Sequence, residues 1–530
     1  MIKIDYKYPN FVLSFPFNKS DLLTVKNLPV RNYRKEDHAW FVPGLAVKTI
    51  EHLKVCWTPV ALNAVKYINK NLLDLVDIKF TGSKNEVLLR GYQRVGVEFL
   101  KTAKKCLLAD DMGLGKSLQL ITVMVELGFK KNLIICPSSL KYNWENEFKK
   151  HFNIQPIVID GNKKKRAELW AADNSFIICS YDILRFDWSI IPKIWDVIGA
   201  DEIVFLKSRQ AVRSKLAKRL QSNIRIGLSG FPLENNLEEF YSIMEWIRPD
   251  ILPTFGRFRS RYVQYDWSGL PVSWKNIDEL HLLTSPFILR RTKEGVLQEL
   301  PDKVYVEYPL SLTTSMEKIY SSICKEFLIY LRSESDREWN SLDPLVKLIR
   351  IRQFVEFPDI LGFKTDNIKL DWLKEVYEYT PKLVVFSCFA ETVKRLADEF
   401  NTGYVIMGDV VSKNRFDIVE HFNKIDRGML VSTDAGRFGL NITGASNIVH
   451  FGSFFNPATM MQREDRLHRI GQKNSVTVLS PFYMDTIDQG IREIFLKRKN
   501  DVIDFLDGSD KMSRSKLSSI DFKNLIFGGV

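Results

Sequence analysis

Short apolar runs alternate with amphipathic stretches along most of this chain, and polar turns separate them. The first series of runs lies at residues 106–109, 132–136, 175–179 and 224–228. The second series lies at residues 382–386, 428–432, 447–451 and 475–479. Runs of this length are typical of buried parallel strands that alternate with helices. The pattern therefore predicts an α/β fold with two lobes, each built on a parallel sheet.

The segments outside the two series have a different character. Up to about residue 85, alternating stretches and turn signals such as residues 8–10 indicate a small α+β unit. From about residue 235 to 375, helical periodicity and proline breaks indicate helical insertions. The predicted organisation is a small α+β domain at 1–85, a first lobe with a helical protrusion at 86–300, a helical insertion or linker at 301–375, a second lobe at 376–505 and a tail at 506–530. We expect disorder in the tail only.

The composition, with 45% hydrophobic and 26% charged residues, is that of an ordinary globular protein, and 530 residues exceed one compact core. No apolar stretch is long enough to cross a bilayer, and residues 1–5 show no secretory segment. We therefore expect an intracellular protein without a membrane partner, in the cytoplasm or nucleoid of a bacterium, in a phage-infected cell, or in a eukaryotic nucleus. The six cysteines are scattered, which favours reduced, mostly buried thiols over disulfides or a structural zinc site.

A surplus of basic residues gives the chain a formal net charge of +12. The surplus is concentrated in clusters at residues 163–166, 209–219, 257–261 and 497–499. Such a surplus favours a polyanionic partner, and nucleic acid before a membrane surface. Any single basic cluster is more often a solvated face than a contact site, so the partner has to be argued from motifs.

A glycine-containing stretch, Asp110–Ser117, follows the first apolar run and precedes an amphipathic segment. Gly113 and Gly115 allow backbone N–H groups to approach phosphate. Lys116 supplies a positive charge for the β- and γ-phosphates, and the Ser117 hydroxyl suits Mg²⁺. A strand before the loop and a helix after it favour a nucleotide-binding loop over a chance occurrence.

An acidic pair, Asp201 and Glu202, closes the apolar stretch 194–200. Two acids at the end of a buried strand fit metal binding by Asp201 and activation of a water molecule by Glu202. On its own, such a pair is more often an exposed surface feature.

The run Gln462–Gln472 carries several arginines. If the run is helical, Gln462, Arg466 and Arg469 share one face, because positions three and four residues apart are neighbours on a helix. Side chains on one face can point together at one anionic target. This geometry suggests arginine fingers over a nucleotide.

Taken in order along the chain, these motifs and several others closely resemble the helicase motifs of SWI/SNF-type superfamily-two ATPases. The matching stretches are residues 90–100, 110–117, 136–147, 180–181, 201–202, 228–236, 433–441, 456–458 and 462–472. The resemblance spans about residues 86–495, and the block Gln-x3-Arg-x2-Arg-Ile-Gly-Gln is highly specific. In the usual phosphate-binding motif, the position of Asp110 is a glycine. The resemblance explains this difference, because this family's version of the loop lacks that first glycine.

The resemblance implies two RecA-like lobes and a DNA-dependent ATP hydrolase that uses ATP and Mg²⁺. The catalytic residues would be Lys116, Asp201, Glu202, Arg466 and Arg469. The nucleotide would be bound by Gln93, which would read adenine, and by Gly113, Gly115, Lys116, Ser117, Asp434 and Gln462. The metal would be held by Ser117 and Asp201. Arg466 and Arg469 would reach across from the second lobe to the transferring phosphoryl group.

Members of the family move along double-stranded DNA by opening and closing the cleft between the lobes, usually without separating the strands. By analogy, the DNA backbone would be contacted by Ser138, Ser139, Lys141, Ser180, Ser387, Thr433 and Arg437. Hydroxyls and amides that contact phosphate carry no sequence code, so binding should tolerate any sequence and weaken with salt. For each hydroxyl alone, capping of a strand end is an equally good explanation.

Three positions depart from the family pattern, namely Val204, Phe231 and Arg437. Val204 and Phe231 replace polar side chains that usually link the ATP site to the DNA side, and we hypothesise an apolar contact in their place. Looser coupling of hydrolysis to DNA is the expected result. Arg437 stands where the family prefers glycine and adds a positive charge. Hydrolysis itself is expected, because the catalytic residues are all kept.

The first segment resembles the small HARP-type domain that precedes the motor in annealing helicases. The similar stretches are residues 15–18, 25–29, 31–33 and 39–43. This resemblance implies strand annealing or fork remodelling in replication, recombination or repair. The alternative is an unrelated α+β cap in which Trp40 and Tyr33 are core aromatics. Two other functions stay open, a motor that displaces proteins such as RNA polymerase from DNA, and a non-hydrolysing, nucleotide-dependent DNA clamp. We expect a monomer.

Overall fold

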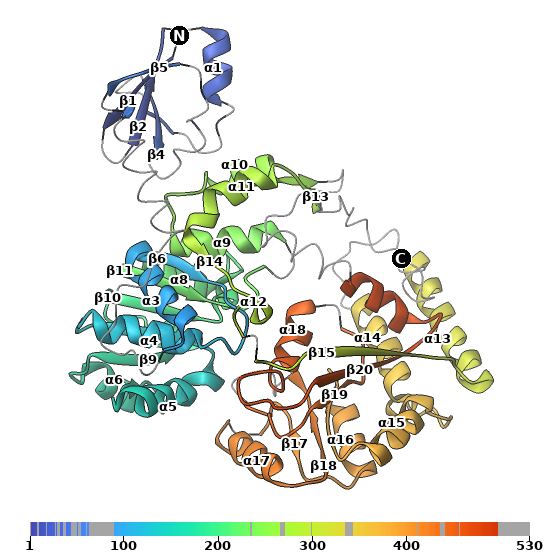
Figure 1. The fold of residues 1–530 in the computed structure, drawn as a ribbon. Coiled ribbons are helices and arrows are strands. Elements are labelled where there is room, and N and C mark those ends of the chain that lie inside the picture. Colours follow the sequence, from blue (N-terminus) through green and yellow to red (C-terminus); the bar gives the residue numbers. More distant parts are fainter. Residues whose placement is uncertain are drawn as a thin grey trace. The chain divides into compact units, whose positions relative to one another are not determined.

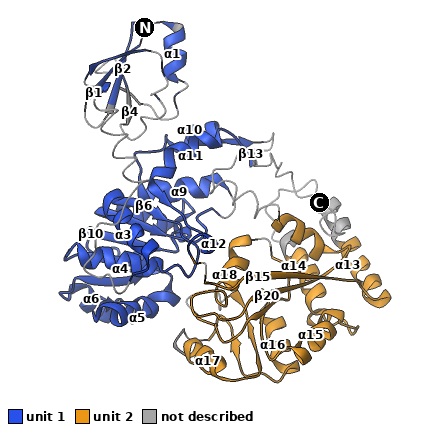
Figure 2. Cartoon of the chain, viewed as in Figure 1, with its two compact units in different colours: residues 1–296, 502–516 blue, residues 297–501, 517–530 orange. Residues whose placement is uncertain are grey.

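The computed structural model describes most of the chain between residues 89 and 496 and shorter stretches before it (Figure 1). The described residues are 2–7, 10–16, 18–26, 28, 32–34, 39–43, 50, 53, 55–59, 61–62, 89–233, 236–265, 271–297, 299–333, 343–410, 412–434, 440–454 and 456–496. The chain divides into two compact units between Val296 and Leu297, called unit 1 and unit 2 below (Figure 2). The predicted tail at 506–530 lies outside the described residues.

Near the N-terminus, five strands form one sheet in the order β3-β4-β2-β1-β5. These elements are β1 (Lys3–Lys7), β2 (Asn10–Ser14), β3 (Asn32–Arg34), β4 (Ala39–Pro43) and β5 (Cys56–Trp57), with helix α1 (Lys19–Lys26) after β2. Strands β1 and β2 are antiparallel, whereas β1 and β5 are parallel. Ile4, Phe11 and Leu13 are fully buried and form part of the core. The described part of this segment therefore has α+β character.

The larger sheet of unit 1 has seven strands in the order β14-β6-β11-β10-β7-β9-β8, and neighbouring strands are parallel. The strands are β6 (Lys105–Leu108), β7 (Asn132–Cys136), β8 (Ile157–Val158), β9 (Phe176–Ser180), β10 (Ile194–Asp201), β11 (Gln221–Leu228) and β14 (Ile288–Leu289). The first series of apolar runs thus forms strands, as predicted. Every residue of β7 is buried, which requires cover on both faces of the sheet.

Helices provide this cover (Figure 1). They include α3 (Gly91–Ala103), α4 (Lys116–Glu126), α5 (Lys141–Phe152), α6 (Lys163–Ala171), α7 (Tyr181–Phe186), α8 (Val212–Arg219) and α9 (Leu237–Ile247). Helix α4 packs closely on strand β10, because a Cβ atom at Gly199 would lie 2.4 Å from Leu120 Cδ2. This packing fixes where α4 begins.

The chain leaves the sheet after β11 and returns to it at β14. The excursion comprises α9, α10 (Phe255–Tyr262), the hairpin of β12 (Val263–Tyr265) and β13 (Pro271–Trp274), and α11 (Ile277–Thr284). Strand β14 then pairs with β6, with Leu289 opposite Leu108. A short helix, α12 (Lys293–Val296), follows. The return brings residues 288–293 beside the start of the glycine-containing loop.

Unit 2 contains a six-stranded parallel sheet in the order β15-β20-β19-β16-β18-β17. The strands are β15 (Lys303–Leu310), β16 (Lys382–Phe386), β17 (Val405–Ile406), β18 (Gly428–Ser432), β19 (Asn447–His450) and β20 (Val476–Tyr483). The second series of apolar runs therefore also forms strands. The α/β fold with two lobes built on parallel sheets is confirmed.

The helices of unit 2 lie mainly between its strands in the sequence. They are α13 (Thr314–Ser333), α14 (Asp343–Glu356), α15 (Ile368–Tyr379), α16 (Ala390–Glu399), α17 (Ser412–Lys424) and α18 (Pro457–Glu464), followed by a helix at 487–496. The segment 301–375 was expected to be a helical insertion. It does contain helices, but it also contributes strand β15 to the sheet, in register with the whole of β20.

Candidate functional site

The glycine-containing loop joins strand β6 to helix α4. Gly113 and Gly115 have φ angles of +87° and +75°, in the left-handed region that favours glycine. A Cβ atom at Gly115 would also lie 2.3 Å from Gln93 Nε2. Helix α4 begins at Lys116, so the backbone N–H groups of its first turn point out of the helix beside the loop. This cradle has the geometry of the loops that bind phosphate in other proteins, and phosphate binding by this loop stays a prediction.

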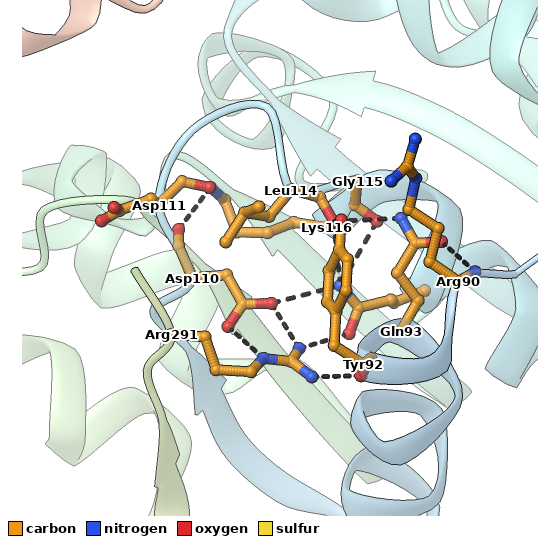
Figure 3. Close-up of polar contacts among 10 residues, drawn as sticks. Arg90, Tyr92, Gln93, Asp110, Asp111, Leu114, Gly115, Lys116 and Arg291 are labelled. Atoms are coloured by element: carbon orange, nitrogen blue, oxygen red, sulfur yellow. Dashed lines mark hydrogen bonds and ion pairs between the residues drawn. The ribbon is translucent and has the colours of Figure 1, made fainter. Parts of the chain in front are cut away.

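The Lys116 ammonium group lies over the loop's own backbone (Figure 3). Its Nζ donates to the carbonyl oxygens of Asp110 at 2.7 Å and Asp111 at 3.2 Å. These are neutral acceptors, so the positive charge of Lys116 is kept at the mouth of the cradle. Ser117 follows in the first turn of α4.

Gln93 lies on helix α3 and contacts the loop directly. Its side chain is buried, its Oε1 accepts from the Arg90 N–H at 2.9 Å, and its Nε2 donates to the Leu114 carbonyl at 3.1 Å. The Tyr92 hydroxyl donates to the same carbonyl at 3.2 Å. The structure thus brings Gln93 to the phosphate loop, and its contact with adenine stays a prediction.

Asp110 occupies the position of the missing glycine, and its carboxylate is fully buried. Arg291 Nε donates to Asp110 Oδ1 at 2.8 Å, and Arg291 Nη2 forms an ion pair with Oδ2 (Figure 3). Arg291 Nη2 also donates to Gln119 Oε1 at 2.8 Å, and Nη1 donates to the Tyr92 carbonyl. Sequence reasoning missed Arg291, because it lies far from the loop in the chain.

The acidic pair lies at the end of strand β10, and two aromatic residues hold Asp201. Trp144 Nε1 donates to Asp201 Oδ2 at 2.8 Å, and the Glu202 N–H donates to Oδ1 at 3.0 Å. The Tyr181 hydroxyl donates to the Asp201 carbonyl at 2.7 Å, and burial raises its pKa well above the usual value. Tyr181 therefore remains a neutral donor. Trp144 and Tyr181 lie in stretches that resemble the family's motifs, but their contacts with Asp201 could not be read from the sequence.

Glu202 has a left-handed backbone, with φ +46° and ψ +58°. Such a conformation is uncommon outside glycine and is unfavourable by about 1 kcal/mol or more. Its side chain is nearly buried. The surroundings therefore hold Glu202 in one orientation after the strand ends.

The register of the sheet brings the loop and the acidic pair to one edge. Leu108, which precedes the loop, pairs with Leu228 on β11, and Leu228 pairs with Asp201 on β10. Neighbouring strands are about 4.8 Å apart, so the two site segments begin roughly 10 Å from one another. They share the carboxyl edge of a parallel sheet, where ligands bind in such folds.

The arginine run of unit 2 is only partly helical. Helix α18 ends at Glu464, and turns follow, so the condition that the run is helical as far as Arg469 is not met. The expected convergence of the arginines is nevertheless present. Arg466 Nη1 donates to the Leu440 carbonyl at 3.5 Å, and Arg469 Nη1 donates to the same oxygen at 3.0 Å. Arg466 also donates through Nε to the Gln462 carbonyl at 3.2 Å.

Asp434, predicted to bind nucleotide, pairs with the neighbouring Arg463. Arg463 Nε donates to Asp434 Oδ1 at 3.0 Å. The guanidinium is completely buried and lies 3.8 Å from the ring centroid of Phe454 and 5.1 Å from that of Phe386. The pair with Asp434 fixes the segment after β18 to helix α18, and the stacking holds the guanidinium in place.

The predicted DNA-contacting residues differ in exposure. Ser138 is exposed and Ser139 is half-buried, in the turn after β7. Lys141 is buried and pairs with Asp160 at 3.0 Å, and Ser180 is buried at the end of β9. Strands β7 and β9 are neighbours, so both segments reach the same edge of the sheet.

In unit 2, Ser387 is fully buried, and its hydroxyl donates to Glu356 Oε2 at 2.5 Å. Thr433 follows strand β18. Arg437 lies outside the described residues. Within unit 1, Val204 and Phe231 are both buried, each a few residues past the end of neighbouring strands β10 and β11. A contact between Val204 and Phe231 stays a hypothesis.

Comparisons with known proteins match most of the chain to two domain families. A model of the SNF2-related domain matches residues 92–360, and a model of the helicase conserved C-terminal domain matches residues 368–471. The chain belongs to the SNF2-related family. The first match contains Lys116, Asp201 and Glu202, and the second contains Arg466 and Arg469. This SNF2-related chain therefore carries both domains of a helicase-type ATPase.

Curated relatives are considerably longer than this SNF2-related chain. An uncharacterized ATP-dependent helicase of Mycoplasma genitalium is 30% identical over 432 residues, which are 77% of this chain and 41% of the relative. A putative ATP-dependent helicase/translocase of Bacillus subtilis is 29% identical over 454 residues, which are 78% of this chain and 48% of the relative. The chain thus spans less than half the length of these relatives. The SWI2/SNF2 ATPase core of Sulfolobus solfataricus in complex with dsDNA is 27% identical, with 84% of this chain and all of that chain covered and a TM-score of 0.41.

In the described part of the chain, no helix is both long and apolar enough to span a membrane.

Proposed function

We propose that this SNF2-related protein is an ATP-driven translocase that acts on double-stranded or forked DNA. The observation that carries the proposal is the row Leu108, Leu228 and Asp201, which brings the phosphate loop and the acidic pair to one sheet edge. Phosphoryl transfer needs a phosphate cradle, a metal-binding carboxylate and a group that activates water, and this edge offers all three.

The oxygen donors at this edge fit Mg²⁺ rather than a softer metal. The Ser117 hydroxyl and the Asp201 carboxylate are hard ligands, and Mg²⁺ usually takes one or two such protein ligands together with phosphate oxygens. When bound, the ion would neutralise charge on the phosphates. Lys116 and the first amides of α4 would hold the phosphate chain, and Glu202 would accept the proton of the attacking water.

The converging arginines support a role in hydrolysis rather than in nucleotide binding. Arg466 and Arg469 share a single carbonyl acceptor, so two positive charges are held close together. Such a pair is well suited to the charge that develops on the transferring phosphoryl group.

DNA binding is supported by the net charge of +12 and by the exposed Ser138 next to the sheet edge. Hydroxyl and amide contacts to phosphate predict binding that tolerates any sequence and weakens steeply with salt. The HARP-like first segment is the reason to favour annealing or fork remodelling, in replication, recombination or repair, over displacement of proteins from DNA.

The test is to measure ATP hydrolysis and strand annealing on forked DNA, linear duplex and single strands. Fork-specific annealing supports the proposal, duplex-stimulated hydrolysis without annealing indicates a protein-displacing motor, and no hydrolysis on any DNA indicates a non-hydrolysing clamp. Lys116→Ala serves as the inactive control. Arg469→Ala should bind nucleotide normally and hydrolyse it about a thousandfold more slowly, as expected for an arginine finger. Normal hydrolysis by Arg469→Ala would remove this residue from the mechanism.

A further inference from the structure

Arg291 contacts the phosphate loop, although it lies far from the loop in the sequence (Figure 3). We propose that Arg291 is a positioning residue of the ATP site and that it holds the loop in its binding conformation through Asp110. This proposal rests on the function proposed above. Arg291 itself would not touch the nucleotide. It would act through the residues that do.

The contacts of Arg291 join both flanks of the loop. Asp110 lies at the start of the loop, Tyr92 lies on helix α3 before it, and Gln119 lies one turn into helix α4 after it. One guanidinium group thus contacts the loop and the helices α3 and α4 at the same time. A planar, five-donor group can do this, whereas an ammonium group cannot reproduce the same fork of contacts.

The backbone beside Arg291 reinforces these contacts. The Ala109 N–H donates to the Leu289 carbonyl at 2.7 Å, and the Asp111 N–H donates to the Arg291 carbonyl at 3.0 Å. The Lys293 N–H in turn donates to Asp111 Oδ2 at 3.0 Å. The segment therefore extends the pairing of β14 along the first residues of the loop. The amides of Ala109 and Asp111 are used here and therefore face β14 rather than a phosphate.

The contacts of Arg291 with Asp110, Tyr92 and Gln119, called the Arg291 clamp below, need the space that a glycine leaves. A Cβ atom at Gly96 would lie 1.8 Å from Gln119 Oε1 and 2.7 Å from Arg291 Nη2. Gly96 has an ordinary helical position in α3, so no unusual backbone angle explains it. Its lack of a side chain is explained by the clamp. Gly96→Ala should therefore displace Arg291 without removing any polar group.

The clamp also accounts for the buried charge at the missing glycine position. Asp110 is completely buried, and a buried carboxylate is stable only when it is paired and hydrogen-bonded. The Asp110 carbonyl accepts from Lys116, so a shift of Asp110 would move the catalytic ammonium as well.

Unit 1 contains another buried arginine–aspartate pair, which resembles the pair of Arg291 with Asp110 but, among the described residues, makes no hydrogen bond with the loop. Arg166 donates to Asp187 through Nε and Nη2, both at 2.8 Å, and Asp187 is also nearly fully buried. The side chains of Arg291 and Arg166 are 13% and 16% exposed. Arg166→Gln therefore controls for the loss of a buried, two-bond arginine–aspartate pair as such.

The experiment compares Arg291→Gln, Arg291→Lys, Gly96→Ala and Arg166→Gln with the unaltered chain. Hydrogen–deuterium exchange of residues 109–119 is measured without nucleotide, and affinity for a fluorescent ADP analogue is measured with Mg²⁺. We expect Arg291→Gln and Gly96→Ala to speed exchange in the loop and to weaken nucleotide binding about tenfold or more, as misplaced binding groups do. Arg291→Lys should recover part of both losses, and Arg166→Gln should change neither.

Loop exchange and nucleotide affinity that are unchanged in Arg291→Gln would overturn the proposal, and so would equal changes in Arg166→Gln. If the unaltered chain binds no nucleotide, the proposed function fails. The exchange measurement would still decide whether Arg291 holds the loop.

Discussion

At the scale of single residues, the acidic pair is held by groups whose contacts the motifs do not reveal. Trp144 and the Glu202 N–H fix the two oxygens of Asp201, and Glu202 itself has a left-handed backbone. Residues in such strained conformations persist only where their surroundings determine them, and they are frequent at functional sites. The strain at Glu202 therefore agrees with the role that the sequence predicts for it.

Glu202→Gln tests this role, because it removes the proton acceptor and keeps the shape of the side chain. We expect the ATPase rate to fall by about a hundredfold or more, the usual contribution of a general base. Binding of a fluorescent ADP analogue should not change. Steady-state hydrolysis and a fluorescence titration measure the two quantities. Glu168→Gln, at an exposed position of α6, should have normal activity. Near-normal hydrolysis by Glu202→Gln would exclude Glu202 as the base.

At the scale of elements, the sequence predicts buried strands well and short or edge strands poorly. Apolar runs such as 132–136 become strands because both of their faces are covered. Strand β14 has only two residues, too few for any periodicity, and β15 is largely exposed and pairs with a strand much later in the chain. The run 462–472 is helical only as far as Glu464, and turns follow, with Gly471 at φ +102°.

The candidate site follows the same division. Residues inside contiguous motifs, such as Lys116 and Asp201, could be named from the sequence. The support from Arg291 could not, because the fold brings it in from a distant segment, and the contact between Trp144 and Asp201 could not be read from the sequence either. Supporting contacts of this kind depend on which strands are neighbours, and one sequence does not specify that.

Glu464 links helix α18 to strand β15 in unit 2. Lys303 Nζ lies 3.1 Å and the Tyr305 hydroxyl 2.8 Å from Glu464 Oε2, and His450 Nε2 lies 3.5 Å from Oε1. Burial raises the pKa of Glu464, but the charge of Lys303 and the contacts with His450 and Tyr305 outweigh it and hold the pKa at about 2. The ionised carboxylate therefore stabilises the folded state above about pH 4.3, and this stabilisation is lost as the pH falls toward 2.

Glu464→Gln should lower the free energy of unfolding of unit 2 by about 3 kcal/mol at pH 7, because it removes the buried carboxylate whose pKa is held at about 2 and leaves Lys303 with Asp465 as its partner. The difference from the unaltered chain should shrink as the pH falls below 4.3, where Glu464 itself becomes protonated. Urea unfolding at neutral and acidic pH measures this difference. Glu420→Gln breaks an exposed pair with Lys424 and should have little effect at any pH. A difference that is the same at every pH would contradict the linkage.

At the scale of the whole molecule, the question is how strongly DNA controls hydrolysis. Val204 and Phe231 are buried apolar residues at two positions where the family usually has polar ones. An apolar contact depends less on orientation than a hydrogen bond does, so it transmits a movement between two sites less specifically. We therefore expect weak coupling between DNA binding and ATP hydrolysis. Coupling between two sites is itself a free energy, and a smaller one gives a smaller change in rate.

Duplex DNA should therefore stimulate ATP hydrolysis by well under about a hundredfold, which lies near the upper end of usual coupling strengths. A double variant, Val204→Gln with Phe231→Thr, should increase the stimulation by restoring polar side chains at both positions. ATPase rates with and without duplex DNA provide the measurement. The single variants Val204→Gln and Phe231→Thr show whether the effect needs both substitutions or only one of them. Stimulation of about a hundredfold in the unaltered chain would defeat the hypothesis.

The hydrogen bond from Trp144 to Asp201 also has an optical consequence. The indole N–H of a tryptophan that is only 1% exposed points at the carboxylate predicted to bind Mg²⁺. Withdrawal of electron density from that carboxylate by a bound cation alters the electric field along the indole, and the emission of an indole responds to such a field. The protein would thus carry a fluorescent reporter of its own metal site, which Trp144→Phe would silence while the other tryptophans continue to emit.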